Sequence, residues 1–280
     1  MSLHMRLAGA GSLPSDASSY VLGMPHLSPN GLSENWLWKE LGHRHWNMIA
    51  KAYGRAATGF GSVGDQPIYA AFRNISLHGG DLGGVRENDS LDVSSTIAHL
   101  SETRVVSRHL AACQDQLIAD VEMTSVFVRR QAEGVNRSIT RARMEGGENI
   151  RLPPQVRKVE LAASDRSVSH HGECAEEYEL GAVLIEPCPY LDFNGAGLLY
   201  FSSFIAAVDR AEWRLIGKDA ALYATRERRA VFHANIEIGD DLTVRILTSQ
   251  HSNVCRHRAL LCGSVDGRLL AEVMTCRAIT

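Results

Sequence analysis

The chain contains one motif twice, and this repeat constrains the fold more than any other feature of the sequence. Residues 25–36 and residues 189–200 align at an offset of 164 positions. The matched pairs are Pro25 with Pro189, Leu27 with Leu191, Asn30 with Asn194, Gly31 with Gly195 and Trp36 with Tyr200. Because a long helical pattern follows each motif, the repeat predicts two copies of one fold.

Shorter matches continue downstream in the same order along the chain. Tyr69-Ala70 pairs with Tyr223-Ala224, Arg108-His109 with Arg256-His257, and Met123-Thr124-Ser125 with Met274-Thr275-Cys276. The offset drifts, as it would after loop insertions and deletions in two diverged copies. Chance similarity between two unrelated α+β halves is the alternative.

The spacing of apolar residues predicts a long helix after each motif and several antiparallel strands after each helix. The helices are expected over 31–53 and 197–216. The strands are expected over 68–75, 92–100, 104–113, 118–128, 231–238, 242–249, 254–262 and 269–278. A long apolar helix needs a surface to cover, and a curved sheet supplies one. The predicted fold class is therefore α+β, a double hotdog in which two tandem copies each wrap a sheet round a helix.

Breaks in these patterns divide the chain into four parts. Residues 1–19 are rich in Gly, Ala and Ser and lack the apolar run of a signal peptide, so they are expected to form a disordered leader. The two repeats are expected over 20–130 and 185–280. Residues 131–184 contain strong helix and strand breakers and are expected to form a linker.

Composition excludes several classes of function. A formal net charge of −3 gives no general electrostatic reason to bind nucleic acid or an anionic membrane. No apolar run is long enough to cross a bilayer, so no membrane partner is expected. The charged run 226–229 is expected to lie on a solvated face. The six cysteines form no Cys-x-x-Cys pair and are expected to be reduced, in a cytoplasmic protein.

The sequence indicates no metal centre. His43 and His45, and likewise Cys255 and His257, form isolated pairs without further ligands nearby in sequence. The chain has no G-x-x-x-x-G-K-[ST] phosphate loop and no G-x-S-x-G turn.

Both motifs end where a helix is predicted to begin, and free backbone N–H groups there can stabilise a developing oxyanion. Gly31 and Gly195, with the residues that follow them, are the natural donors; the alternative is that they are turn glycines. Asn30 and Asn194 could hydrogen-bond a thioester carbonyl, or they could cap the helices.

Two segments resemble known acyl-thioester enzymes. The segment Met-Pro-His-Leu-Ser-Pro-Asn-Gly-Leu-Ser-Glu-Asn-Trp, residues 24–36, with its continuation to Trp46, resembles the double-hotdog acyltransferase/decarboxylase family of leinamycin-type polyketide biosynthesis. The segment Asp-Phe-Asn-Gly-Ala-Gly-Leu-Leu-Tyr-Phe, from Asp192, is similar to hotdog acyl-thioester enzymes. The resemblance covers roughly 20–130 and 185–280.

The resemblance implies an enzyme that decarboxylates methylmalonyl-CoA and delivers a propionyl group to an acyl carrier protein. Its partners would be an acyl-CoA and an acyl carrier protein, with no cofactor beyond the coenzyme A thioester that serves as substrate. Two fused copies already supply the pairing of a hotdog dimer, and formation of a homodimer is expected in addition.

The resemblance also implies that the acyl group passes through a tyrosine ester. Tyr69 is the preferred candidate, because it would lie on the first strand after the helix. Tyr53, at the helix end, is the alternative, about 30 Å from the helix N-terminus. Either tyrosine could instead be a packing residue.

The remaining candidates lie in the two motifs. His26 could bind the substrate carboxylate or assist proton transfer. Ser33 could contact substrate or cap the first turn. Asp192 could act as nucleophile or base, as in simple hotdog thioesterases, which gives the rival interpretation of a thioesterase or dehydratase. The third interpretation is a non-catalytic thioester-binding scaffold.

Overall fold

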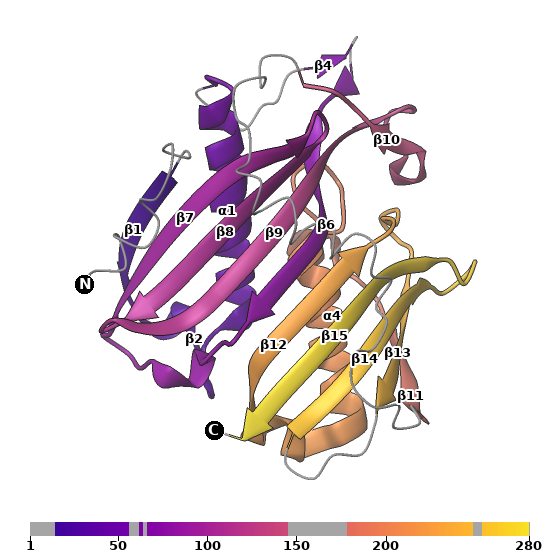
Figure 1. Cartoon of the computed structure of the whole chain (residues 1–280). Helices are drawn as coiled ribbons and strands as arrows, with labels where there is room; N and C mark the ends of the chain where they lie inside the picture. The colour runs from indigo at the N-terminus through magenta and orange to yellow at the C-terminus, as the bar shows by residue number, and fades with distance from the viewer. Residues whose placement is uncertain (1–14, 56–61, 64–65, 145–177, 249–253, 280) are drawn as a thin grey trace.

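The computed structural model describes residues 15–55, 62–63, 66–144, 178–248 and 254–279. These residues form one large antiparallel sheet whose strands run in the order β1-β7-β8-β9-β6-β12-β15-β14-β13-β11, with β10 beside β9. Two long helices, α1 (Glu34–Ala52) and α4 (Phe201–Ile216), lie on the same side of the sheet (Figure 1). No helix in the described ranges is long and apolar enough to cross a membrane.

The strands on each half of the sheet come from one half of the chain. The first half supplies β1 (Ser15–Val21), β6 (Tyr69–His78), β7 (Ser90–Ser101), β8 (Arg104–Cys113), β9 (Gln116–Arg130) and β10 (Ile139–Arg141). The second half supplies β11 (Tyr178–Ile185), β12 (Tyr223–Phe232), β13 (Leu242–Thr248), β14 (Val254–Gly263) and β15 (Leu269–Ile279). Short segments complete the described fold: η2 (Met24–His26), β2 (Leu27–Ser28), β3 (Gly31–Leu32), β4 (Ser62–Val63), β5 (Gln66–Pro67), η3 (Leu82–Gly84), η4 (Asn136–Ser138), α3 (Pro189–Asp192) and η5 (Gly217–Leu222).

The order of connections in the first half recurs in the second. In each half the first long strand after the helix, β6 or β12, lies at the centre of the sheet. The next three strands of the chain follow in reverse order outward: β9, β8 and β7 beside β6, and β15, β14 and β13 beside β12. β6 and β12 pair with each other, from Arg228 opposite Leu77 to Val231 opposite Asn74. This large antiparallel sheet with few helices is consistent with a hotdog-like fold.

The two long helices bury one face against the sheet. In α1 the buried apolar residues recur at helical spacing and include Leu37, Trp38, Leu41, Met48 and Ile49. In α4 they include Phe204, Ile205, Val208 and Ala211. Most of these residues join strand residues in the main hydrophobic core, which spans both halves. Met48 and Ile49 belong to a second, smaller cluster in the first half.

Both helices begin three or four residues later than the sequence predicts. Gly31–Leu32 forms strand β3 beside Leu27–Ser28, so α1 begins only after Ser33. Ser33 is the N-cap, and its Oγ accepts a hydrogen bond from the Trp36 N–H at 3.3 Å. In the second half the residues after Asn194 close a turn, and Tyr200 becomes the N-cap.

The predicted leader and linker are both partly ordered. Residues 15–19, expected in the leader, begin β1 and pair with β7; residues 178–184, expected in the linker, belong to β11 and pair with β13. β1 is an edge strand whose exposed or partly exposed side chains give little hydrophobic signal. β11 does carry apolar residues, and Val183 and Ile185 lie in the main core, but the breakers that precede it led to its assignment to the linker. Residues 1–14 and 145–177 lie outside the described residues.

The central strand of the second half lies earlier than predicted. β12 covers Tyr223–Phe232 rather than residues 231–238, and it includes the charged run expected on a solvated face. Arg228 is fully buried, whereas Glu227 and Arg229 are exposed. Its guanidinium reaches Glu34 at 2.8 Å and Asp209 at 2.9 Å, and these ion pairs make the burial of a charged strand residue tolerable.

Candidate functional site

The two motifs form loops at opposite ends of the central strand pair. In the first loop (residues 26–33), Asn30 Nδ2 donates to the Tyr223 carbonyl at 3.1 Å, at the start of β12. In the second loop (residues 192–200), the Ala196 carbonyl accepts a hydrogen bond from Arg130, whose guanidinium lies 5.6 Å from the centre of the Tyr69 ring, at the start of β6. Each loop therefore lies near the start of the other half's central strand, β12 or β6.

Asn194 shapes the second loop. Its Oδ1 accepts from the N–H groups of Ala196 at 3.0 Å and Leu198 at 3.1 Å, and its own N–H donates to the Leu198 carbonyl at 2.9 Å. Gly195, at the tip, is different: nothing lies within 4 Å of the position that a Cβ would occupy. Among the described residues the Gly195 N–H has no hydrogen-bond partner. Gly195 is thus an exposed residue whose N–H is not used within the described structure.

Asp192 lies at the base of the second loop and is 5% exposed. Its Oδ2 accepts from the Cys188 N–H at 2.8 Å, and its Oδ1 lies 3.7 Å from Arg210 Nη1. The backbone carbonyl of Asp192 accepts from the Tyr200 N–H at 2.8 Å and from Ser203 Oγ at 3.0 Å. The Cys188 N–H and Arg210 hold the carboxyl group, and the two contacts to the carbonyl hold the backbone of Asp192.

An open depression of about 400 Å³ lies beside this carboxylate. Its walls include Arg210, which contacts Asp192, and the half-exposed Trp213. The remaining lining residues are Ile185, Asp209 and Arg214. Asp192 itself does not line the depression and reaches it only through Arg210.

Two polar residues hold the second loop against Tyr69. Arg130 donates to Asn136 Oδ1 as well as to the loop, and Asn136 Nδ2 donates to the carbonyls of Gly197 at 2.7 Å and Ile236 at 2.6 Å. Arg130 ends β9 and Asn136 lies in the segment predicted as linker. No motif in the sequence marks either residue, since their role depends on a loop about 60 residues further along the chain.

The structure brings Tyr69, Asn194 and Gly195 to one region, with Asp192 at the base of the same loop. It does not bring His26, Asn30 and Gly31 there. Gly31 faces the Leu82 carbonyl, just beyond the far end of β6. Ten residues of strand separate the two ends of β6, which corresponds to about 30 Å.

The first loop is closely packed. Gly31 has a φ of +104°, and a Cβ there would lie 2.1 Å from the Leu82 carbonyl oxygen. His26 Nδ1 accepts from the Gly23 N–H at 2.9 Å, and its ring packs 4.8 Å from that of Trp36. Ser33 caps α1. These contacts give the predicted residues of the first loop structural roles in the described fold, and their chemical roles stay predictions.

Tyr53, the alternative to Tyr69, ends α1 and packs on the rings of His99 at 5.2 Å and Phe127 at 5.7 Å. Burial raises the pKa of Tyr53 to about 12. Its phenolate is therefore scarce at neutral pH, and the geometry favours Tyr69 as the tyrosine beside the second loop.

A buried group of charged residues lies between the helices and the second half of the sheet. Besides Arg228 and its partners, Arg277 Nη2 lies 2.6 Å from Asp209 Oδ1 and 3.0 Å from Glu212 Oε2. Burial alone would raise the pKa of Glu212, but His257, Arg277 and Arg228 lower it to about 2. Glu212 is therefore an anion at neutral pH.

Comparison with known proteins gives structural similarity without sequence similarity. No family model matches the chain, and no curated protein sequence matches it. The structure of an acyl-ACP thioesterase from Bacteroides thetaiotaomicron is similar with a TM-score of 0.65 and 9% identity, over 94% of this chain and 98% of that one. The 12:0-ACP thioesterase from Umbellularia californica gives a TM-score of 0.67 and 13% identity, over 95% and 94% of the two chains. At these identities the similarity establishes a shared fold.

Proposed function

We propose that this chain processes acyl thioesters and that it hydrolyses an acyl-ACP or acyl-CoA at the second loop. We also propose that its two halves are tandem hotdog copies, since the order of their elements is the same. The fold similarity to two acyl-ACP thioesterases, over more than nine-tenths of each chain, supports this class of substrate. The observation that carries the proposal is the fixed Asp192 carboxylate in the loop that exposes the Gly195 N–H.

The geometry suits hydrolysis by general base catalysis. The Asp192 carboxylate takes a proton from a water molecule, whose oxygen adds to the thioester carbonyl carbon. The Gly195 N–H donates to the oxyanion, and one such donor typically lowers the barrier by about 3–4 kcal/mol. The tetrahedral intermediate then expels the thiolate, which takes up a proton, and leaves the free acid.

The test is thiol release from a panel of acyl-CoA and acyl-ACP substrates. We expect Asp192→Asn to lower kcat by about 100-fold or more, which is at the low end of the contribution of a general base. An asparagine oxygen can still accept from the Cys188 N–H, so the melting temperature should change little. Asp120→Asn, which alters a carboxylate paired with Arg108, is the matched control and should stay active. Full activity of Asp192→Asn would contradict the proposal.

A second candidate function is decarboxylating transfer, and the position of Tyr69 favours it. Arg130 contacts both the Tyr69 ring and the Ala196 carbonyl, next to Gly195, so a substrate carboxylate bound there would meet the guanidinium. Methylmalonyl-CoA would lose CO₂ to give an enolate that takes a proton. The Tyr69 oxygen, after losing its proton, would then accept the propionyl group and release coenzyme A, and an acyl carrier protein thiol would remove it.

One assay separates these functions. The protein is incubated with methylmalonyl-CoA and a carrier protein, and both proteins are followed by mass spectrometry. Propionylated carrier, with protein-bound acyl lost in Tyr69→Phe but retained in Tyr223→Phe, supports transfer. Free acid that disappears in Asp192→Asn supports hydrolysis. Absence of turnover with every acyl thioester would leave a non-catalytic thioester-binding protein.

A further inference from the structure

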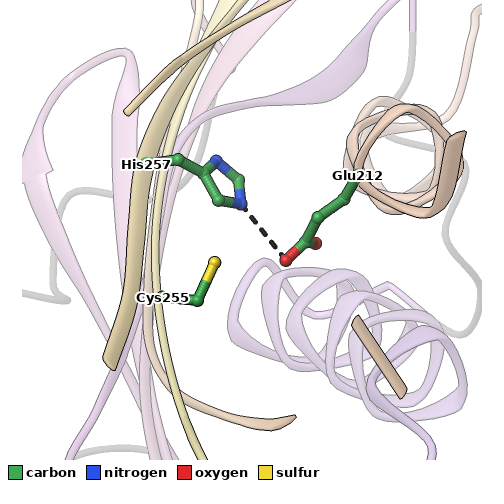
Figure 2. Close-up of side chains that lie close together, drawn as sticks. All are labelled: Glu212, Cys255 and His257. Atoms are coloured by element: carbon green, nitrogen blue, oxygen red, sulfur yellow. Dashed lines mark ion pairs between the residues drawn. The ribbon is translucent and has the colours of Figure 1, made fainter. Parts of the chain in front are cut away.

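Helix α4 and strand β14 bring three metal-ligating side chains together. Cys255 and His257 are two residues apart on β14 and therefore face the same side of the sheet, toward Glu212 on α4 (Figure 2). One ligand atom from each residue lies within 4.8 Å of the other two. The sequence alone hides this group, because Glu212 precedes Cys255 by about 40 residues.

His257 is buried without a hydrogen bond. Its side chain is 1% exposed, and neither ring nitrogen makes a hydrogen bond within the described structure. Nε2 points at Glu212 Oε1 across 3.4 Å (Figure 2). Buried polar atoms without hydrogen bonds are rare and costly, and an ion between the imidazole and the carboxylate would satisfy this one.

The donor set selects the metal. A thiolate sulfur, an imidazole nitrogen and a carboxylate oxygen together suit zinc, whereas magnesium and calcium prefer oxygen ligands alone. Tetrahedral zinc places its ligand atoms about 3.4 Å apart, so small side-chain rotations would complete the site. Three protein ligands leave one position for water.

The surroundings complement a dication. Arg277 donates to Glu212 Oε2 at 3.0 Å, which orients this carboxylate, as residues outside the ligand set commonly do. Among the described residues of the buried group, the three carboxylates of Glu34, Asp209 and Glu212 face two guanidiniums, those of Arg228 and Arg277. With a neutral His257, the form that a metal ligand takes, one negative charge is left over. A zinc ion with a Cys255 thiolate adds one net positive charge and makes the group neutral.

A catalytic role for the cysteine fits less well. Burial raises the pKa of the Cys255 thiol to about 11, so it is a poor nucleophile at neutral pH without a metal.

We propose that Glu212, Cys255 and His257 bind a zinc ion that fastens helix α4 to strand β14. The proposal is independent of the reaction that the second loop performs. A metal that binds only the folded chain also raises its melting temperature.

The test measures zinc on the intact chain. The protein is equilibrated with micromolar zinc, desalted and analysed for metal, and we expect one zinc per chain. Cys255→Ser and His257→Gln should bind at least 10-fold more weakly. Cys262→Ser changes another partly buried cysteine of β14 and is the matched control, with binding unchanged.

A second measurement does not depend on how the variants fold. Cobalt added to the wild-type chain should give a thiolate-to-metal charge-transfer band, and Cys262→Ser should keep it. Zinc should also raise the melting temperature of wild type and of Cys262→Ser. A wild-type chain that binds neither ion would overturn the proposal and leave a buried Glu212–His257 ion pair. Zinc binding that persists unchanged in both ligand variants would overturn it too.

Discussion

At the residue scale, two histidines are buried as neutral groups in the first half. His45 Nδ1 lies 2.6 Å from Ser107 Oγ and His45 Nε2 lies 2.8 Å from Ser125 Oγ. Ser107 Oγ also contacts His109 Nε2 at 2.7 Å, and His109 Nδ1 contacts Ser95 Oγ at 2.8 Å. Burial lowers the pKa of His45 to about 3, and burial likewise lowers that of His109 well below its ordinary value.

This burial makes stability depend on pH. Between pH 6.5 and about 3 the unfolded chain binds a proton at His45 and the folded chain does not, so the free energy of unfolding falls as the pH falls through this window. His45 alone should remove about 2 kcal/mol between pH 7 and pH 5. Urea unfolding at both pH values should show that loss in wild type and in His43→Gln, an exposed control, and a smaller loss in His45→Gln. Equal losses in all three chains would rule out a buried neutral His45.

Arg228 carries the second prediction at this scale. Arg228→Ala leaves the Glu34 carboxylate, which is 10% exposed, without its ion-pair partner, whereas Asp209 keeps Arg277. Removal of one partner of such a buried pair typically costs about 3–5 kcal/mol. Arg229→Ala, on the exposed side of the same strand, should change the free energy of unfolding by less than about 0.5 kcal/mol. Chemical denaturation of both variants measures the difference, and similar values would show that the buried ion pairs contribute little.

Four residues of the candidate site could be identified from the sequence, but the contacts that bring them together could not. Asn194 and Gly195 follow from the repeat, Asp192 follows from the resemblance to hotdog thioesterases, and Tyr69 follows from the strand after the first helix together with the resemblance. The joining of Tyr69 to the second loop depends on Arg130 and Asn136, which act only through tertiary contacts. The first loop repeats the motif but packs about 30 Å away along β6.

At the scale of elements, the two long helices meet at a glycine. A Cβ on Gly42 of α1 would lie 2.6 Å from the Tyr200 hydroxyl and 2.7 Å from Phe201 Cε1, at the start of α4. Gly42→Val adds volume to this contact and improves helix propensity by only a few tenths of a kcal/mol, so we expect a net loss of about 2 kcal/mol.

Thermal or chemical unfolding of this variant tests the contact between α1 and α4. Lys39→Val places the same side chain on the exposed face of α1 and should cost less than about 1 kcal/mol. If both variants lose the same stability, helix propensity rather than the meeting of the helices is responsible.

The elements themselves were largely predictable where one face is apolar. The strand 104–113 appears with the bounds expected, and the alternation over 118–128 predicts the centre of β9. β12 was misplaced because its register is set by buried ion pairs and by pairing with β6, and neither leaves an apolar pattern. β1 was missed because an edge strand can be polar, and the apolar β11 was missed because it directly follows a segment rich in breakers.

At the scale of the whole molecule, the sheet continues across the boundary between the halves through β6 and β12. The main hydrophobic core and the Glu34–Arg228 pair also join the halves. We therefore expect one cooperative unfolding transition for both halves.

Tryptophan positions make this prediction measurable. Trp36, Trp38 and Trp46 lie on α1, and the fourth tryptophan of the chain, Trp213, lies on α4. In Trp213→Phe the fluorescence reports the first half alone, while circular dichroism reports both halves. The two midpoints should coincide in denaturant. Separated midpoints would mean that each half unfolds by itself.

The contrast between Gly31 and Gly195 has an evolutionary consequence. A symmetric pair of identical subunits must carry every substitution in both copies, whereas a fused chain can change one copy alone. Here the Leu82 carbonyl fills the space beside Gly31, and the space beside Gly195 is open. Fusion thus permits a division of labour, in which one copy of the motif specialises in holding the molecule together while the other stays free to meet a ligand.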